Sequence, residues 1–206
     1  MPLQDYFSKD PDKRAHFIFS LISSIYAKTD NTISKGFWAS TKALEALIGI
    51  KNKTVLDIGS GTGAWSTNFM RMGARQVSGV DFVEKMVIQA QKKHPDIDFT
   101  IGNGEDLSQF NDHSFDIVTA SYVLHGMKKE KREKMLLEMK RISKKHVVIH
   151  DFIGKTPLFV RFLEFMEQSD YVFFKKNFNN EMKNHFINTT KTATRYGSGL
   201  YIGEIE

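Results

Sequence analysis

The chain has 206 residues, a hydrophobic content of 41% and no cysteine. This length favours a single domain, 1–206, with a sizeable core, and the lack of cysteine excludes disulfides, thiolate metal ligands and thiol nucleophiles. The net charge is +5, no run of about 20 apolar residues is available to span a membrane, and no apolar run follows the first basic residues, so we expect a cytoplasmic protein.

Two aromatic-rich amphipathic stretches, Asp12–Tyr26 and Ser34–Ile48, open the chain. Apolar residues recur along both at helical spacing, so we expect two helices. We interpret residues 1–50 as a helical cap or lid and residues 51–206 as an α/β core. Tyr26 is a candidate for lining a substrate pocket, with an ordinary place in the core as the alternative.

From residue 53 onwards, short apolar runs alternate with segments of helical spacing. The strand-like runs are Lys53–Ile58, Gln76–Val80, Ile97–Ile101, Phe115–Ala120 and His146–His150. The helical segments between them are Ala64–Met72, Glu84–Lys93 and Lys129–Ile142. This alternation is typical of βαβ units, so we expect an open, twisted, mostly parallel sheet with helices on both faces.

A glycine-rich turn containing Gly59, Gly61 and Gly63 follows the first run directly. Open α/β sheets bind ligands at this edge, and glycines let the backbone come close to them. Asp81 follows the second run, where it is placed to accept hydrogen bonds from ribose hydroxyls. The spacing fits a dinucleotide as well, but the carboxylate of Asp57 would repel a pyrophosphate and suits an ammonium group. We therefore predict that the loop binds S-adenosylmethionine.

The third run is followed by Gly102-Asn103-Gly104-Glu105. Asn103 offers hydrogen-bond donors and acceptors for the edge of an adenine. The alternative is an Asn-Gly turn without a ligand. One adenosyl ligand would account for all three strand ends.

The positive charge is concentrated between Lys128 and Lys145. This segment holds nine basic and three acidic residues, a net charge of +6, which leaves the rest of the chain at −1. Either it is a solvated helix face, or it is a docking surface for an anionic partner.

The last part of the chain departs from the alternation. Aromatic residues at helical spacing predict a helix over Thr156–Lys176. Lys191–Tyr196 and Leu200–Ile205 flank Gly197-Ser198-Gly199, so we expect a β-hairpin, because glycines permit the positive φ of tight turns.

The motifs resemble those of class I S-adenosylmethionine-dependent methyltransferases, in the branch of the UbiE/COQ5 quinone C-methyltransferases (methyltransferase type 11). The resemblance rests on Asp57–Gly63, Gly79-Val80-Asp81-Phe82, Gly102-Asn103-Gly104-Glu105 and Phe110–Asp116, and covers about residues 15 to 153. It implies a Rossmann-like sheet of seven strands, the last one antiparallel. It also implies cofactor contacts at Phe82, Asn103, Gly104 and Glu105, to which we add Ser121 at the end of the fourth run.

The segment after the fourth run departs from that branch. Leu124-His125-Gly126 stands where the quinone enzymes usually carry an Arg-Asn pair. The resemblance therefore implies the cofactor and the transfer chemistry, but not a quinone as substrate.

Two histidines at strand ends, His125 and His150, are candidates for the catalytic base. In-line methyl transfer is accelerated mainly by positioning, and a base within hydrogen-bond reach assists an acceptor that loses a proton. Tyr122 and Asp151 are candidates for binding the acceptor. Each of the four has a structural alternative: His125 as a loop residue, His150 and Asp151 as strand-end residues, and Tyr122 as part of the core. We predict no metal, because His146 and His150 are four residues apart on one strand.

The sequence thus predicts a methyltransferase that acts on a small-molecule acceptor by direct in-line transfer. Two alternatives stay open: a non-catalytic binding module of the same fold, and a methyltransferase of nucleic acid or protein. Nucleic acid is the weaker of these, because no Asn-Pro-Pro-type motif follows the fourth run.

Overall fold

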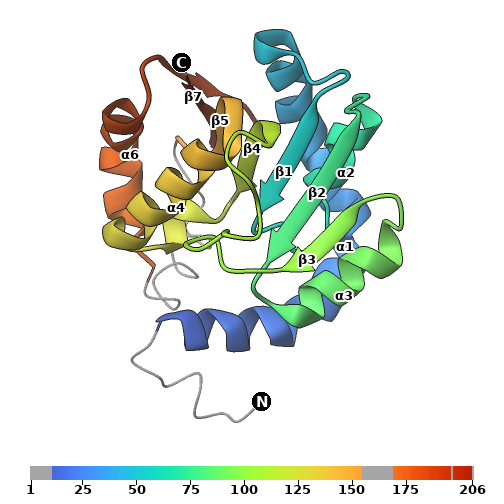
Figure 1. The fold of residues 1–206 in the computed structure, drawn as a ribbon. Helices are drawn as coiled ribbons and strands as arrows, with labels where there is room; N and C mark the ends of the chain where they lie inside the picture. The colour runs from blue at the N-terminus through green and yellow to red at the C-terminus, as the bar shows by residue number, and fades with distance from the viewer. Residues whose placement is uncertain (1–10, 155–168, 196, 206) are drawn as a thin grey trace.

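The fold is a seven-stranded sheet with helices on both faces, shown by a computed structural model that describes residues 11–154, 169–195 and 197–205 (Figure 1). The strands are β1 (Thr54–Ile58), β2 (Gln76–Asp81), β3 (Asp98–Ile101), β4 (Phe115–Ser121), β5 (Ser143–Phe152), β6 (Thr189–Ala193) and β7 (Ser198–Glu204). Their order is β3-β2-β1-β4-β5-β7-β6. β1 to β5 run parallel, and β7 is antiparallel to both of its neighbours. The expected fold class is confirmed.

The order of the strands reverses between β1 and β4. From β1 the chain winds outward to β2 and β3, and then returns to β4 on the other side of β1. The loops after β1 and β4 therefore diverge from neighbouring strand ends, which is the place where open α/β sheets bind their ligands.

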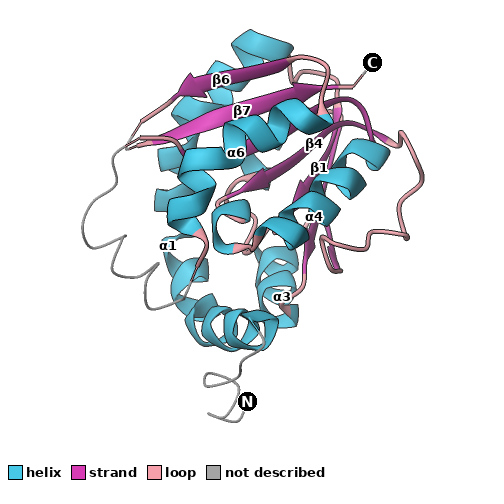
Figure 2. Cartoon of the chain, turned by 90° about the vertical axis from the view of Figure 1, so that its left-hand side faces the viewer, coloured by secondary structure: helices cyan, strands magenta, loops and turns pink. Residues whose placement is uncertain are grey.

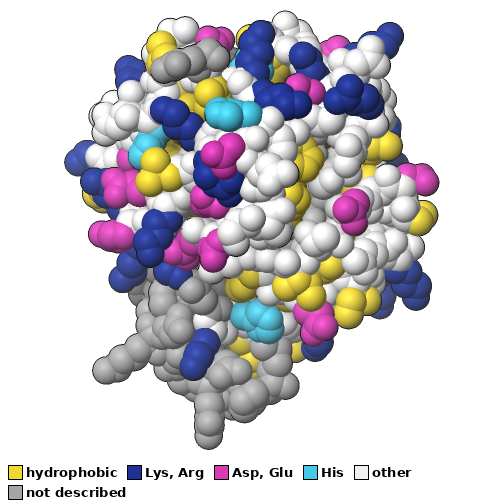
Figure 3. Space-filling view, viewed as in Figure 1, with side chains coloured by type: hydrophobic (Ala, Val, Ile, Leu, Met, Phe, Trp, Pro, Cys, Tyr) yellow, Lys and Arg dark blue, Asp and Glu magenta, His cyan; other side chains and the backbone are white. Residues whose placement is uncertain are grey.

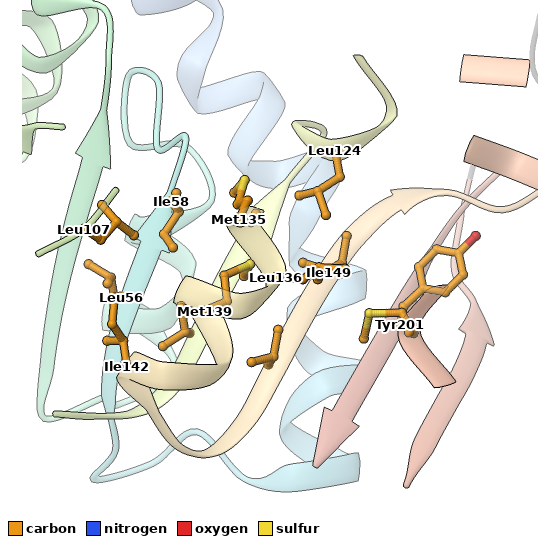
Figure 4. Close-up of a cluster of buried hydrophobic side chains, with 14 of the residues drawn as sticks. Leu56, Ile58, Leu107, Leu124, Met135, Leu136, Met139, Ile142, Ile149 and Tyr201 are labelled. Atoms are coloured by element: carbon orange, nitrogen blue, oxygen red, sulfur yellow. The ribbon is translucent and has the colours of Figure 1, made fainter. Parts of the chain in front are cut away.

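The core is divided by the sheet into two layers. One layer packs α4 (Lys129–Ile142) and α6 (Tyr171–His185) on the sheet, and Figure 4 shows Met135, Leu136 and Met139 of α4 facing its strands. The other layer packs α1 (Pro11–Ile48), α2 (Ser66–Arg71) and α3 (Glu84–Lys93). Successive residues of β5 alternate between these layers, because side chains of a strand alternate between its faces.

The N-terminal segment is one continuous helix, α1, so the expectation of two helices was wrong. No proline occurs between the two predicted stretches, and Gly36, which lies within the second one, costs a helix only about 1 kcal/mol relative to alanine. Figure 2 shows α1 running along the bottom of the molecule and then upwards beside the sheet. Leu44 and the following Ile50 are fully buried in the core, so the end of α1 is a structural cap. That its first half forms a lid remains a prediction.

The second half of the chain differs from the predicted bounds in three places. β5 begins at Ser143 and has ten residues, because its start pairs with Phe115 and its end pairs with β7. The helix predicted over Thr156–Lys176 falls largely on residues 155–168, which lie outside the described residues, and the helix that is described there, α6, runs on to His185. The hairpin of β6 and β7 is confirmed, but each strand begins two residues before its predicted start, so Ser198 and Gly199 belong to β7 and not to the turn. No helix within the described residues is both long and apolar enough to cross a membrane.

Candidate active site

The three glycines of the loop after β1 all have positive φ, but they differ in what surrounds them. A side chain at Gly59 would overlap Val123, and one at Gly63 would overlap His94 and Phe99. Gly61 has a φ of 53°, and a Cβ placed there would meet no atom within 4 Å. Gly59 and Gly63 are therefore required by packing, whereas Gly61 is the position where the loop backbone faces open space.

Asp57 lies inside β1 and is fully buried beneath this loop. Its Oδ2 accepts a hydrogen bond from the Ser66 hydroxyl, whereas Oδ1 has no hydrogen-bond partner. Burial, assisted by the nearby Asp81, raises the pKa of the Asp57 carboxyl to about 7 against the opposing effect of the hydrogen bonds from Ser66. An unpartnered buried carboxylate oxygen is costly, and a cationic or hydrogen-bonding ligand group would relieve that cost.

Asp81 ends β2 and is nearly buried, with both carboxylate oxygens facing the loops. Oδ2 accepts from the Gly61 N–H and Oδ1 from the Val83 N–H, each over 2.8 Å. Burial raises the pKa of Asp81, while these backbone hydrogen bonds lower it. Asp81 thus fixes the position of Gly61, and each oxygen retains a lone pair for a ligand hydroxyl. The adjacent Phe82 is partly exposed and packs against the ring of His16.

The turn after β3 is stabilised by a hydrogen bond from its backbone to the side chain of Asn103. Oδ1 of Asn103 accepts from the Glu105 N–H over 3.1 Å, and the exposed Asn103 pairs with Asp106 in an isolated bridge. A side chain at Gly104 would press on Ile58. Glu105 forms an ion pair of 3.1 Å with Lys131 of α4. That Asn103, Gly104 and Glu105 contact the cofactor remains a prediction.

His150, at the end of β5, is buried among aromatic rings on the α1 and α2 side of the sheet. It stacks on Trp65 at 4.7 Å, and Phe37 and Tyr122 meet it edge-on. Its Nδ1 lies 2.9 Å from the Ser121 hydroxyl, and its Nε2 has no hydrogen-bond partner. Burial lowers the pKa of His150 to about 4, so the ring is neutral near pH 7.

His125 lies in the 3-10 turn η2 (Leu124–Gly126) that follows β4, and it is directed towards the α6 side of the sheet. Its Nδ1 is 2.9 Å from Oδ1 of Asp151, and its backbone N–H donates to Oδ2 over 3.3 Å. Asp151 is fully buried and also accepts from the Phe152 N–H. The structure therefore brings His125 and Asp151 together as a pair, and separates them from His150 by the alternation of β5.

Tyr122 lies between the two histidines. Its ring is 5.1 Å from His150 and 6.2 Å from His125, and its φ is 54°. Burial raises the pKa of Tyr122, whereas a hydrogen bond with Ser198 lowers it. Tyr26 belongs to α1, but its side chain lies outside the described residues.

Sequence reasoning missed two contributors to this region, Trp65 and Phe37. Trp65 donates its indole N–H to Thr119 and stacks on His150, and Phe37 of α1 packs against Trp65, Tyr122 and His150. Trp65 directly follows the glycine loop, which is a signal that was available. Phe37 carried no local signal, because its contact depends on the path of α1.

The basic side chains of the segment Lys128–Lys145 differ in burial and in their ion pairs. Arg132 is fully buried and binds Glu181 through two hydrogen bonds and Asp170 through a third. Arg141 pairs with Glu138 and Asp112. Figure 3 shows lysine and arginine side chains spread over the visible face of the molecule and interspersed with acidic ones. These contacts favour the interpretation as a solvated helix face over a docking surface.

Comparisons with known proteins address the family. Residues 55–146 match the family model of a methyltransferase domain. The chain is 30% identical over 111 residues to a demethylmenaquinone methyltransferase of Chlorobaculum tepidum, which covers 51% of this chain and 46% of the relative. It is 35% identical over 75 residues to a ubiquinone biosynthesis O-methyltransferase of Neisseria meningitidis, which covers 34% of this chain and 32% of the relative. The chain thus aligns with less than half the length of these curated relatives.

Solved structures share the fold. A magnesium protoporphyrin IX methyltransferase from Synechocystis with bound SAH superposes with a TM-score of 0.61 at 20% identity, over 86% of this chain and 83% of that one. A putative S-adenosyl-L-methionine-dependent methyltransferase from Methanococcus maripaludis superposes with a TM-score of 0.65 at 14% identity, over 91% of this chain and 94% of that one.

Within the described residues, no three His, Asp or Glu side chains form a group that would hold a metal ion.

Proposed function

Since the chain carries a class I methyltransferase domain of the UbiE/COQ5-like type, we propose that it transfers the methyl group of S-adenosylmethionine directly to a small-molecule acceptor. The observation that carries the proposal is the open position at Gly61, held by the buried Asp81 beside the unpartnered Oδ1 of Asp57. The family match supports the same cofactor.

The residues around the loop fit this cofactor. Gly61 provides the place where backbone and ligand come close, and Asp57 provides an anionic partner for the methionine ammonium group. Asp81 is suited to the ribose hydroxyls, and Asn103 to the adenine edge. When bound, the cofactor supplies a methyl group that its sulfonium already activates, so the protein needs no covalent intermediate. Its own contribution is to hold the acceptor in line and to exclude water.

The acceptor is proposed to lie over the ends of β4 and β5. Phe37, Tyr122 and Phe152 present aromatic rings there, and two histidines add polar atoms. Such a lining suits a small, partly apolar molecule. The names of the relatives, which refer to quinones and a porphyrin, support the same class of acceptor without specifying one.

Two measurements test the proposal. Titration calorimetry should show binding of S-adenosylhomocysteine and none of NAD. Incubation with methyl-labelled S-adenosylmethionine and a cell extract should then label a compound of low molecular mass. Binding without any transfer would favour a non-catalytic module, and label in RNA or protein would refute the small-molecule acceptor.

A further inference from the structure

We infer that His16, in the first half of α1, binds the nucleoside half of S-adenosylmethionine. This inference rests on the proposed function and deepens it, because it adds to the cofactor site a residue from outside the α/β core. Asp81 and Phe82 bind this half of the cofactor from the end of β2, and His16 covers it from the helix.

The first observation is the course of α1. Figure 1 shows the first half of this helix below the sheet, on the side to which the arrowheads of β1 and β2 point. The glycine loop follows the carboxyl end of β1, and Asp81 forms the carboxyl end of β2. Open α/β sheets bind their ligands at this edge. The first half of α1 therefore lies on the side of the sheet where the cofactor is proposed to bind.

The second observation is the contact between His16 and the end of β2. The ring centroids of His16 and Phe82 are 5.9 Å apart, with an interplanar angle of 57°. Burial raises the pKa of Asp81, the backbone N–H groups bound to its oxygens lower it, and the charge of His16 lowers it further. The imidazole therefore lies within Coulombic reach of the carboxylate. His16 thus meets both residues at the end of β2 that are predicted to contact the cofactor.

The third observation is the open space beside Asp81. Its Oδ2 accepts a hydrogen bond from the Gly61 N–H over 2.8 Å, and a Cβ placed on Gly61 would meet no atom within 4 Å. The next residue after Asp81, Phe82, exposes 39% of its surface. A ligand that occupies the space at Gly61 and reaches the carboxylate of Asp81 therefore comes close to His16, because both Gly61 and His16 interact with that carboxylate.

The fourth observation concerns the face of α1 that carries His16. Ser20 and Ser23 lie four and seven residues further along the helix, so they share a face with His16. These two serines are only 4% and 3% exposed, whereas Leu21, on the opposite face, is 71% exposed. His16 therefore belongs to the buried face of α1, in agreement with its contact to Phe82.

The chemistry of an imidazole suits a nucleoside. In its neutral form one ring nitrogen donates a hydrogen bond and the other accepts one, which matches the hydroxyls of a ribose and the polar edge of an adenine. The flat ring also packs against other flat rings, as it does against Phe82. The methionine half of the cofactor has neither a hydroxyl nor a flat ring, so the contact of His16 falls on the nucleoside half.

Titration calorimetry of the full chain with S-adenosylhomocysteine and with adenosine tests this contact. His16→Ala should weaken the binding of both ligands by the same factor, about five- to tenfold, because both contain the nucleoside. Leu21→Ala, on the exposed face of the same helix, is the matched control and should bind both ligands with wild-type affinity. Alanine has the highest helix propensity, so neither substitution should disrupt α1.

Proton–carbon NMR of the wild-type chain with labelled histidine gives a readout that a merely structural role of His16 would not move. Saturation with S-adenosylhomocysteine should shift the Cε1–H resonance of His16, because the ligand then lies against its ring. The resonance of His185, at the far end of α6, should stay in place. The His16 resonance is identified by its loss in His16→Gln, so the measurement decides the question even if His16→Ala fails to fold.

The outcomes separate this inference from the proposed function. Equal affinity in His16→Ala and Leu21→Ala, or a His16 resonance that does not move when the ligand binds, would overturn the inference and leave cofactor binding intact. A loss of affinity for S-adenosylhomocysteine without a loss for adenosine would place His16 at the methionine half and overturn the inference as well. A wild-type chain that binds neither ligand would refute the proposed function and the inference together.

Discussion

Gly61→Ala tests whether the open position in the glycine loop faces the cofactor. The added methyl group meets no atom within 4 Å, but the residue must adopt a φ of 53°. For alanine that conformation costs roughly 1–2 kcal/mol. In a chain of this size, 1 kcal/mol lowers the melting temperature by about 2–4 °C, so we expect a loss of about 2–8 °C.

Gly49→Ala is the matched control. Gly49 also has a positive φ, of 69°, and open space around its Cα, but it lies at the end of α1 away from the loop. Both variants should therefore lose similar stability in thermal unfolding. In calorimetry only Gly61→Ala should lose affinity for S-adenosylhomocysteine, by at least about tenfold, which corresponds to about 1.4 kcal/mol. Equal affinity in the two variants would show that the open space at Gly61 is not where the ligand lies.

Three further predictions concern buried charges. Asp81→Asn should weaken binding of S-adenosylhomocysteine by about ten- to several-hundred-fold, because hydrogen bonds to charged groups contribute about 1.5–3 kcal/mol each, and calorimetry that finds wild-type affinity would remove Asp81 from the site. Burial raises the pKa of the Asp57 carboxyl in the native state to about 7. Between about pH 4 and 7 the native state therefore binds more protons than the unfolded state. The protonated Asp57 consequently contributes to the stability of the fold at low pH, and this contribution is lost as the pH rises through about 7. Asp57→Asn should consequently be more stable than the wild type at pH 8 and lose this advantage by pH 5, and denaturant unfolding that shows no such crossover would contradict the assignment. Arg132→Met should lower the free energy of unfolding by about 3–5 kcal/mol, because it leaves Glu181 buried without its partner. The control Lys129→Met, at an exposed ion pair, should change the free energy of unfolding by less than about 1 kcal/mol. Denaturant unfolding midpoints of the two variants test this difference, and equal midpoints would contradict it.

The strands and the glycine loop were predictable because their signals are local. Apolar runs of five or six residues bounded by turns specify β1 to β4, and the glycines after β1 mark the turn directly. The bounds of α3 and α4 were also predicted correctly, since a helix with a clear apolar stripe carries its own periodicity.

What could not be predicted depends on contacts between distant residues. Arg132 was counted with a solvated basic segment, because its burial follows from Glu181, 49 residues away. Asp151 reaches His125 only because β5 lies beside β4 in the register that pairs His150 with Ser121. Phe37 reaches His150 through the course of α1. No local pattern in the sequence encodes these three contacts.

Transfer of label from methyl-labelled S-adenosylmethionine to the low-mass compounds of a cell extract tests the central claim most directly. We predict one labelled compound of low molecular mass, formed together with S-adenosylhomocysteine by the wild-type chain and by Gly49→Ala, and strongly reduced with Gly61→Ala when the cofactor is not saturating. Absence of any labelled product from a folded chain that binds S-adenosylhomocysteine, with extracts from several sources, would contradict the claim that this protein is a small-molecule methyltransferase.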